Sequence, residues 1–469
     1  MSANTATTPD AQLTLDADLV RKYDGLGPRY TSYPTADRFS EAFTAEHMTH
    51  ALLERVAASV SQPLSLYVHI PFCNTICYYC ACNKVVTKNH RRAAKYIDYV
   101  GKEIGIVSAL ANTSAPIKQL HWGGGTPTFL SPDEMTLLMR MLRDNFSFDD
   151  DAECSIEVDP RKVGDGIVAL LGQLGFNRMS LGVQDFDPDV QRAVNRIQSE
   201  AETRAVIDAA RKNGFRSLNV DLIYGLPRQT VSGFSSTLEK VISASPDRIA
   251  LYSYAHVPHL FKPQRQISEA ELPSPEQKLA ILALAIDMLT AGGYVYIGMD
   301  HFAKPDDELT IAQRAGKLHR NFQGYSTHAD CDLLSFGISA IGKLGATYGQ
   351  NVRTLEDYYA RLDAHALPCF RGWHLSADDV LRREVIQSLM CQFTVDIHAI
   401  ESAHNIEFYD YFAVELEALA ALAADRLVEI APGQIDVTAR GRLLVRAVAM
   451  VFDRFLRTAR EPVRYSRVI

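Results

Sequence analysis

The feature that most restricts the fold is a repeated alternation of short apolar segments with helical patterns in the 469-residue chain. The apolar segments are rich in residues that favour strands and cover residues 64–72, 117–122, 154–158, 178–183, 218–224 and 249–254. Between the first two, apolar side chains recur at helical spacing at Ile97, Val100 and Ile104. Strands and helices that alternate in this way require parallel strands joined by right-handed crossovers. The sequence therefore predicts the α/β class, and the spacing alone fits an open sheet and a complete or partial barrel equally well.

Polar and glycine-rich loops follow each predicted strand. They cover residues 71–82, 123–127, 157–160, 184–186, 221–227 and 255–258. In α/β folds, the loops at the carboxyl ends of the strands converge on one face, and that face carries the functional site. We therefore expect these loops to build one shared pocket.

Charge and hydropathy exclude several classes of protein. The chain has 48 Lys and Arg against 56 Asp and Glu, a formal net charge of −8, whereas a nucleic-acid binder usually has an excess of basic residues. Residues 1–15 lack the basic start and apolar core of a secretory signal. No run of about 18 apolar residues, the length needed to span a membrane, occurs in the sequence. We expect a monomeric cytoplasmic protein without nucleic-acid or membrane partners, in a compartment where structural disulfides are uncommon.

Four of the eight cysteines lie close together, at Cys73, Cys77, Cys80 and Cys82. Three thiolates with the spacing C-x3-C-x2-C can converge from one loop on an iron–sulfur cluster or on zinc. A structural zinc site needs four ligands, commonly supplied as two separated pairs, and here only Cys82 or a histidine could complete the set. The spacing favours a cluster, and three ligands on a cubane leave one iron open. The other four cysteines stand alone and are expected to be small buried side chains.

The cysteine loop also carries a resemblance to a known superfamily. The segment Tyr67-Val68-His69-Ile70-Pro71-Phe72-Cys73, followed by Cys77, Tyr79 and Cys80, resembles the signature of the radical S-adenosylmethionine (SAM) enzymes. The resemblance implies that Cys73, Cys77 and Cys80 bind a [4Fe–4S] cluster whose open iron binds SAM. One-electron cleavage of SAM then gives a 5′-deoxyadenosyl radical that abstracts hydrogen from the substrate.

Further segments narrow the resemblance to one family. GPRYTSYPT at 27–35, CNK at 82–84, HWGGGTP at 121–127, IYGLP at 223–227 and the closing SRVI at 466–469 are similar to the oxygen-independent coproporphyrinogen III oxidases (dehydrogenases) of haem biosynthesis. The resemblance implies oxidative decarboxylation of two propionates of coproporphyrinogen III to vinyl groups, which gives protoporphyrinogen IX. It also implies an electron donor and an electron acceptor, which the sequence does not identify.

The resemblance implies a fold as well. Residues 51–370 are expected to form a partial (βα)6 radical-SAM barrel, and residues 1–50 an N-terminal arm that contributes to the substrate site. In residues 371–469, the sequence predicts helices at 376–393, 408–425 and 440–456 and a hairpin at 427–437. We therefore expect a small, mostly helical, winged-helix-like C-terminal domain. Its arginines, at 440, 442, 446, 454 and 457, could touch DNA but more simply form a solvated helix face.

Cofactor contacts are carried over from the family to matching positions. Glycines allow close backbone approach and can offer N–H groups to an anion, although a tight turn explains them equally. Charged residues that end apolar strands need a partner or water. A bound ligand could be that partner, although simple exposure to solvent at the rim of the sheet would satisfy the charge as well. By resemblance, SAM is contacted by Tyr67, Tyr79, Gly124, Gly125, Thr126, Glu157, Gln184, Arg196, Asp221, Ala255 and Ile341. Two SAM molecules are implied.

The substrate-facing residues are expected in the N-terminal arm. Arg29 and Tyr30 combine charge with aromatic surface, which suits propionates and pyrrole rings, although the arm could instead simply dock on the barrel. Cys82 is expected to assist electron or hydrogen handling rather than to bind iron. Two alternatives stay open, a haem-binding chaperone of the same superfamily and a zinc-stabilised interaction module, and the presence of Cys82 and of residues 27–35 weighs against the chaperone.

Overall fold

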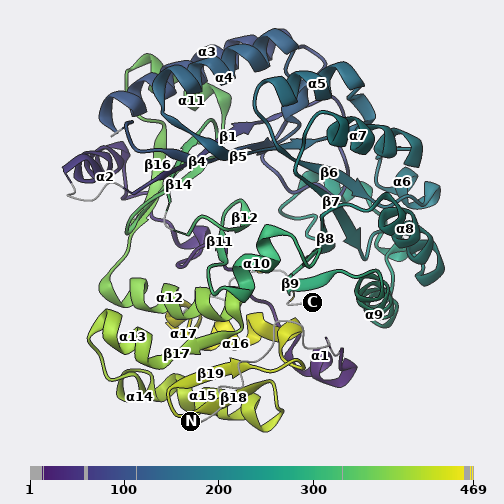
Figure 1. The fold of residues 1–469 in the computed structure, drawn as a ribbon, viewed down its shortest axis with the longest axis vertical. Helices are drawn as coiled ribbons and strands as arrows, with labels where there is room; N and C mark the ends of the chain where they lie inside the picture. The colour runs from purple at the N-terminus through teal and green to yellow at the C-terminus, as the bar shows by residue number, and fades with distance from the viewer. Residues whose placement is uncertain are drawn as a thin grey trace. The chain divides into compact units, whose positions relative to one another are not determined.

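The computed structural model contains the predicted alternation of strands and helices (Figure 1). It describes residues 13, 15–57, 62–111, 113–329, 331–458, 465 and 467. Two segments used in the sequence analysis therefore lie mostly outside the described residues. They are residues 1–15, in which no secretory signal was found, and the closing residues 466–469. The six predicted strands are present as β1 (Leu64–Ile70), β4 (Ile117–Gly124), β5 (Phe148–Val158), β6 (Arg178–Gln184), β7 (Ser217–Tyr224) and β8 (Arg248–Ser253).

These six strands lie side by side in chain order and are parallel, as predicted. The helices that connect them cover the outer face of the curved sheet (Figure 1). They are α3 (Arg91–Leu110), α4 (Pro132–Asn145), α5 (Asp165–Gln173), α6 (Pro188–Ala193), α7 (Glu200–Lys212) and α8 (Val231–Ala244). Leu66 and Val68 of β1 are fully buried with Ile97 of α3 in one apolar core, which is the burial that parallel strands require. The predicted α/β class is confirmed.

The sheet continues beyond β1 instead of closing. β13 (Asp332–Phe336) pairs with β1 in parallel, and β14 (Ile341–Leu344), β15 (Thr347–Asn351) and β16 (Cys369–His374) follow with antiparallel pairing. The arrangement is a partial barrel, as expected from the resemblance.

A buried carboxyl fixes the turn between β13 and β14. Glu103 of α3 is 2% exposed and accepts hydrogen bonds from the Gly337 N–H (2.7 Å), Asn351 Nδ2 (2.6 Å) and the Tyr358 hydroxyl (2.5 Å). Burial raises the pKa of this carboxyl to about 7, although the three donors oppose the rise. Tyr358 belongs to α11 (Leu355–Asp363), so Glu103 connects two helices to the strand turn.

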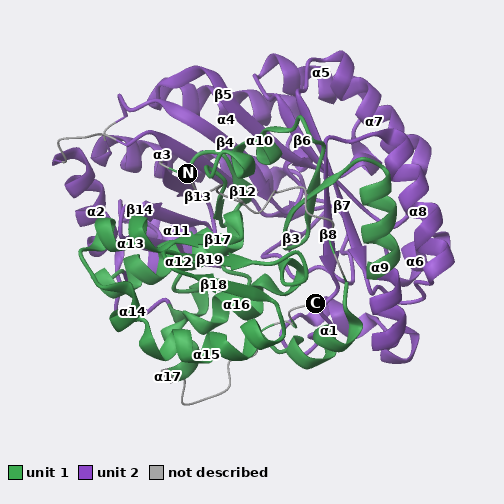
Figure 2. Ribbon diagram, turned by 60° about the horizontal axis from the view of Figure 1, so that its bottom comes forward, with its two compact units in different colours: residues 1–38, 282–329, 375–469 green, residues 39–281, 330–374 purple. Residues whose placement is uncertain are grey.

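The described chain divides into two compact units, coloured separately in Figure 2. One comprises residues 39–281 and 330–374 and contains the parallel sheet; we call it the barrel unit. The other comprises residues 1–38, 282–329 and 375–469, and we call it the C-terminal unit. Both units are discontinuous in sequence, and the expected domain boundaries at residues 50 and 370 stay a prediction.

The remaining elements complete the two units. The barrel unit adds α2 (Ala45–Ala57), β2 (Phe72–Cys73) and β3 (Val85–Val86), and helix α9 (Pro275–Ala291) follows β8. The C-terminal unit contains α1 (Ala17–Tyr23), β9 (Val295–Gly298), β10 (His301–Ala303), α10 (Glu308–Arg314), β11 (His319–Asn321), β12 (Gly324–Ser326), α12 (Ala377–Gln392), β17 (Thr394–Asp396), α13 (Ile397–His404), α14 (Phe408–Tyr411), α15 (Ala413–Ala424), β18 (Val428–Ala431), β19 (Gln434–Val437), α16 (Val445–Val451) and α17 (Arg454–Thr458). No described helix combines the length and apolarity needed to cross a membrane.

The C-terminal unit confirms part of the prediction for its region. Ser376 caps α12 in a capping box with Asp379, and β18 and β19 form the expected hairpin. Two segments were each predicted to form one continuous helix, and both predictions are wrong. Residues 408–425 split into α14 and α15, and residues 440–456 break before α17. The second break occurs where the Asp453 carboxylate accepts the Phe455 N–H (2.9 Å), which is the geometry that starts a new helix.

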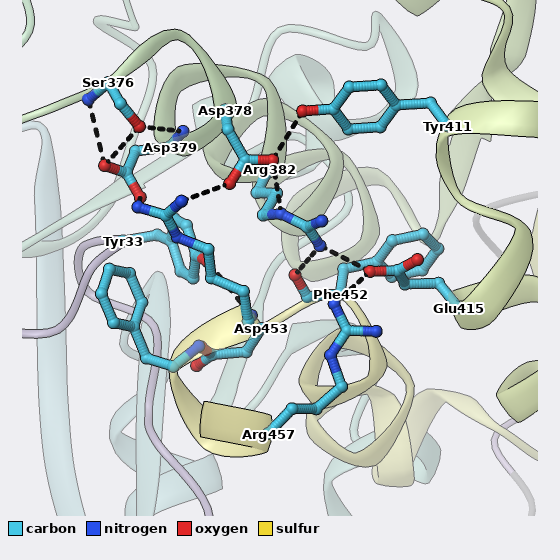
Figure 3. A network of polar contacts seen from close by, with 12 residues as sticks. Tyr33, Ser376, Asp378, Asp379, Arg382, Tyr411, Glu415, Phe452, Asp453 and Arg457 are labelled. Atoms are coloured by element: carbon cyan, nitrogen blue, oxygen red, sulfur yellow. Dashed lines mark hydrogen bonds and ion pairs between the residues drawn. The ribbon is translucent and has the colours of Figure 1, made fainter. Parts of the chain in front are cut away.

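Two of the five arginines, Arg442 and Arg446, belong to the interior of this unit, whereas the side chains of Arg440, Arg454 and Arg457 are 40%, 34% and 40% exposed. Arg442 and Arg446 are each 3% exposed, which contradicts the interpretation preferred from the sequence. Figure 3 shows the polar network that Arg382 and Arg457 enter. Arg454 pairs with Asp378 and Asp379 (2.8 Å each), and Arg457 pairs with Glu415 (2.5 Å), as does Arg382 (2.7 Å). Carboxylates within the unit satisfy Arg382, Arg454 and Arg457, whereas the buried Arg446 donates to the backbone carbonyls of Gly27, Pro28 and Arg467.

Candidate functional site

The cysteine loop connects β1 to α3 at the carboxyl end of the strand. Within it, β2 and β3 pair in parallel, so that Cys73 lies opposite Val86, and the Cys80 N–H donates to the Cys77 carbonyl (3.2 Å) in a tight turn. Cys73, Cys77 and Cys80 are partly exposed and Cys82 is exposed. The loop therefore places all four thiols at the predicted edge of the sheet.

Hydrogen-bond donors from other loops surround the three thiols. Thr126 Oγ1 donates to Cys73 Sγ (3.6 Å), and Arg196 Nη1 donates to Cys77 Sγ (3.6 Å). The hydrogen bond from Cys82, together with Lys84, lowers the pKa of Cys80 to about 6 although burial opposes this. Thiolates are the form in which cysteine binds metal. The lowered pKa favours that form at Cys80, whereas burial raises the pKa of Cys73 to about 11 although Thr126 opposes the rise.

Ligation of one metal centre by these thiols is not itself visible in the structure. Among the His, Cys, Asp and Glu side chains of the described residues, no three converge in the arrangement of a metal site. The shared cluster of Cys73, Cys77 and Cys80 therefore stays a prediction. What the structure does provide is the donor set: three thiols on one short loop, with cations against two of them.

A tyrosine and a histidine on β1 lie beneath the cysteine loop. His69 Nε2 lies 3.0 Å from the Asn83 carbonyl oxygen and must donate to it, because a carbonyl only accepts. His69 Nδ1 consequently accepts from the Tyr67 hydroxyl (3.0 Å). Burial lowers the pKa of His69, which favours the neutral ring that this bonding needs. Tyr67 also stacks on His121, with ring centroids 5.8 Å apart. Through the bond from His69 to Asn83, Tyr67 and His69 fix the far end of the cysteine loop to β1.

The glycine loop after β4 has no room for side chains. Gly124 has a φ of +110°, and a Cβ at this position would lie 2.4 Å from His69 Cε1; a Cβ on Gly125 would lie 2.7 Å from the Pro71 backbone. One interpretation of the sequence was that the N–H groups of this loop bind an anion. In the structure these groups are already paired within the protein. Those of Gly124, Gly125 and Thr126 donate to Glu157 Oε2 (3.0 Å), the Ile70 carbonyl (2.8 Å) and the Phe72 carbonyl (2.8 Å). The glycines therefore allow the loop backbone to pack closely against His69 and Pro71.

Two carboxyls on β5 and β7, strands separated by β6, have different pKa shifts. Burial and the charge of Glu157 raise the pKa of Asp221 to about 6, although Ser180 and Asn219 donate to it (2.9 and 2.8 Å). Burial also acts to raise the pKa of Glu157, but His121 and the Gly124 N–H outweigh it and lower the pKa. The two groups therefore share one electrostatic environment, with Glu157 the more readily ionised.

Arg196 links the end of β6 to the cysteine loop. It is 7% exposed, and besides Cys77 it donates to the Gly182 carbonyl (2.5 Å) and pairs with Asp159 (3.4 Å). Gln184, at the end of β6, is 9% exposed with a φ of +68°. Both predicted residues thus lie at the same strand end, close to the thiols.

Sequence reasoning missed Gln264, which joins two of the expected SAM contacts, Tyr79 and Ala255. Gln264 is 2% exposed, and its Nε2 donates to the backbone carbonyls of Tyr79 and Ala255 (3.1 Å each). Nothing in the local pattern around Gln264 identifies it, because its partners are far away in sequence. His69 and Asn83 were quoted in motifs, but their mutual hydrogen bond was not foreseen.

The other expected site residues have distinct positions. Ile341 opens β14 of the barrel unit and pairs with Gln350. Arg29 and Tyr30 belong to the C-terminal unit, where Arg29 forms an ion pair with Asp300. Tyr30 has a φ of +46° and is fully buried, and its hydroxyl donates to Asp453 (3.0 Å). Its ring therefore does not offer the exposed aromatic surface that the sequence had suggested.

Comparison with known proteins adds two family matches and close relatives. Residues 67–241 match the Radical SAM superfamily and residues 375–444 the HemN C-terminal domain. The chain is 50% identical over 458 residues to the oxygen-independent coproporphyrinogen III oxidase of Escherichia coli (strain K12), which covers 98% of this chain and 99% of the relative. It is 51% identical over 456 residues to that of Pseudomonas aeruginosa, covering 97% and 98%. The solved structure of coproporphyrinogen III oxidase (HemN) from Escherichia coli, a radical SAM enzyme, matches with a TM-score of 0.90 at 49% identity, covering 95% of this chain and 100% of that one.

Proposed function

The chain belongs to the oxygen-independent coproporphyrinogen III oxidases of the radical SAM superfamily, and from that premise we propose which of its residues carry the reaction. The protein is a radical SAM oxidoreductase that oxidatively decarboxylates coproporphyrinogen III in haem biosynthesis. A [4Fe–4S] cluster and SAM are its cofactors. We assign the cluster to Cys73, Cys77 and Cys80.

The observation that carries this assignment is the donor set around the cysteine loop. Three thiols follow β1 on one loop, and Thr126 and Arg196 donate to two of them from other strand ends. Lys84 Nζ donates to the carbonyls of Cys80 and Cys82 (3.0 and 3.3 Å). Cations and hydroxyls in these positions stabilise sulfur ligands in their anionic form, which fits a cluster held by thiolates. When bound, the cluster and SAM supply one-electron reduction and radical formation.

The residues around the loop are assigned to SAM. The contacts of the glycine loop are assigned to Gly124, Gly125 and Thr126, since the two glycines let the backbone pack closely against His69 and Pro71 and Thr126 reaches Cys73. Glu157, whose pKa is lowered, keeps a carboxylate available for a cationic amino group. The remaining contacts are assigned to Tyr67, Tyr79, Gln184, Arg196, Asp221, Ala255 and Ile341. Two SAM molecules are proposed, because the substrate loses two carboxyl groups.

Substrate recognition is assigned to the N-terminal arm. Arg29 presents a guanidinium suited to a propionate, and its pair with Asp300 fixes its direction. We place Tyr30 behind it, as a buried support bonded to Asp453. Cys82 is exposed next to Cys80, which suits a role in electron or hydrogen handling. We further propose a monomeric cytoplasmic enzyme that depends on an external electron donor and acceptor.

An anaerobic comparison of cysteine variants tests the assignment. Reconstituted wild-type protein should be brown, contain iron and sulfide, and convert coproporphyrinogen III to vinyl-bearing products with release of 5′-deoxyadenosine. Cys73→Ala should lose the cluster and both products. Cys369→Ala is the matched control, because Cys369 is buried in β16 away from the loop, and it should retain them. Substantial vinyl product from Cys73→Ala would contradict the assignment.

A further inference from the structure

A cluster of positive charge directly follows the cysteine loop. Residues 84–95 contain Lys84, Lys88, His90, Arg91, Arg92 and Lys95 and no acidic residue. The chain as a whole has a net charge of −8, so this segment opposes the overall balance. Lys88, Arg91 and Arg92 are exposed, and Val86 beside them is 43% exposed. We call the surface formed by Val86, Lys88, Arg91 and Arg92 the basic surface.

The basic surface is fixed to the two loops that carry the site. The Thr87 N–H donates to the Cys73 carbonyl (3.0 Å), and Val86 lies opposite Cys73 in the β2–β3 pair. His90 stacks on Phe129, with ring centroids 4.2 Å apart, just after the glycine loop. The surface therefore adjoins the first cluster ligand through one backbone hydrogen bond and cannot move independently of it.

The arginines of this surface oppose the dipole of the helix that carries them. Arg91 and Arg92 occupy the first turn of α3, which has no acidic residue, although the Asn89 side chain accepts from the Arg91 N–H (3.1 Å). A cation at a helix N-terminus opposes the helix dipole and costs about 0.3–1 kcal/mol at an exposed site. Among the described residues, Lys88, Arg91 and Arg92 form no ion pair. Exposed cations that oppose a helix dipole and form no ion pair break a local rule of helix design, and such departures are expected at functional surfaces.

We propose that the basic surface is the docking site for an acidic electron-transfer protein that delivers single electrons to the cluster. This inference rests on the proposed function, because reductive SAM cleavage consumes one electron from outside the chain. In the step, the donor loses one electron and the cluster gains it, with no atom transferred. Complementary charge steers such encounters and sets their rate, and the exposed Val86 adds apolar surface.

The surface is better suited to a protein donor than to nucleic acid. Nucleic-acid binders carry their basic excess over a whole face or domain, whereas this chain is acidic overall and its basic surface is confined to a few residues beside the thiols. Its position next to Cys73 has a direct use in electron delivery. Binding of nucleic acid at this surface would have no such use.

Charge reversal tests the proposal on the reconstituted holoenzyme. The test variant is Lys88→Glu, Arg91→Glu and Arg92→Glu, which also adds two helix-favouring acids to the first turn of α3, so its folding is favoured. The control is Arg140→Glu, Lys212→Glu and Arg216→Glu, three exposed cations away from the loop, with the same change of net charge. The probe is a purified acidic flavodoxin, used oxidised for binding and reduced by its NADPH-dependent reductase for turnover. Dithionite serves as the small-molecule reductant.

The expected result separates docking from chemistry. The test variant should bind flavodoxin at least about tenfold more weakly at low salt, with a loss of similar size in flavodoxin-driven SAM cleavage. Its dithionite-driven SAM cleavage should match wild type, and the control variant should match wild type in both. Wild-type affinity should fall as salt rises, because about 0.1 M salt screens exposed charges beyond roughly 10 Å.

Several results would overturn the proposal. The first two are an affinity of the test variant for flavodoxin equal to that of wild type, and an equal loss of flavodoxin affinity in the control variant. The other two are a loss of dithionite-driven SAM cleavage in the test variant, and tight competition by single-stranded DNA for the basic surface. Failure of the proposed function would look different. In that case the wild-type protein itself would lack dithionite-driven SAM cleavage, while the two variants could still be compared in flavodoxin binding.

Discussion

The buried carboxylate of Asp185 offers a sharp test of how the site is held in place. Asp185 follows Gln184 directly and is 2% exposed. Its Oδ1 accepts from the Asp187 N–H (2.8 Å) and the Thr237 hydroxyl (2.7 Å), and its Oδ2 accepts from Gln229 Nε2 (2.6 Å). The perturbation is Asp185→Asn, which keeps the shape but replaces one acceptor with a donor.

The magnitude follows from the bonding of Gln229. Its Oε1 already accepts from the N–H groups of Gly225 (2.7 Å) and Leu226 (3.1 Å), so its amide cannot turn over without losing both. An asparagine NH2 at Oδ2 would face the Gln229 NH2, and at Oδ1 it would face the Asp187 N–H. Either orientation leaves buried donors unsatisfied, at a cost of about 1–3 kcal/mol.

Hydrogen exchange measures this cost where it arises. The amides of Gly225, Leu226 and Asp187 should exchange roughly 5- to 150-fold faster in Asp185→Asn, the factor that corresponds to the lost free energy. Asp187→Asn is the matched control, because Asp187 caps α6 and asparagine caps a helix about as well as aspartate. Unchanged exchange in Asp185→Asn, or equal acceleration in the control, would refute the reasoning.

Three further predictions concern other parts of the molecule, each read by urea denaturation of the metal-free chain. Gly124→Ala should lose at least about 2 kcal/mol, because the new Cβ meets His69 at a positive φ; a loss below 0.5 kcal/mol, roughly what a tolerated surface change costs, would contradict it. Burial raises the pKa of Glu103 from 4.5 to about 7, so the folded state binds the extra proton between these values. The contribution of this carboxyl to stability is full below about pH 4.5 and is lost, by roughly 3 kcal/mol, as the pH rises through 7; Glu103→Gln should flatten this slope, and an unchanged slope would argue against it. Tyr30→Phe should cost about 1–2 kcal/mol, because the buried Asp453 loses a donor; full stability would show that the hydroxyl is not a support.

Local sequence was sufficient for the parallel part of the fold. Each of the six strands is short, apolar and followed by a polar loop, and that pattern requires both faces of a sheet to be covered. Helix starts with strong caps, such as Ser376 at α12, were also predictable. The break before α17 was not predicted, because the hydrogen bond from the Phe455 N–H to Asp453 interrupts residues that the sequence had assigned to one helix.

The functional site shows the same division. The spacing of Cys73, Cys77 and Cys80 and the glycines after β4 were visible as motifs. The donors that surround them were not, since Arg196 and Gln264 reach the cysteine loop from distant segments. The expectation that the glycine loop offers free N–H groups failed for a related reason, because Glu157 had to be placed before its hydrogen bond to Gly124 could be seen.

The sequence by itself determined the order of strands and helices, the class of metal ligand and the family, because each is encoded in residues that are near neighbours along the chain. The tertiary structure alone decided which hydrogen bonds satisfy the buried polar groups, which pKa values shift, and which cations stay without an ion pair. Those properties depend on distances between segments that are far apart in sequence, and neither periodicity nor spacing carries that information.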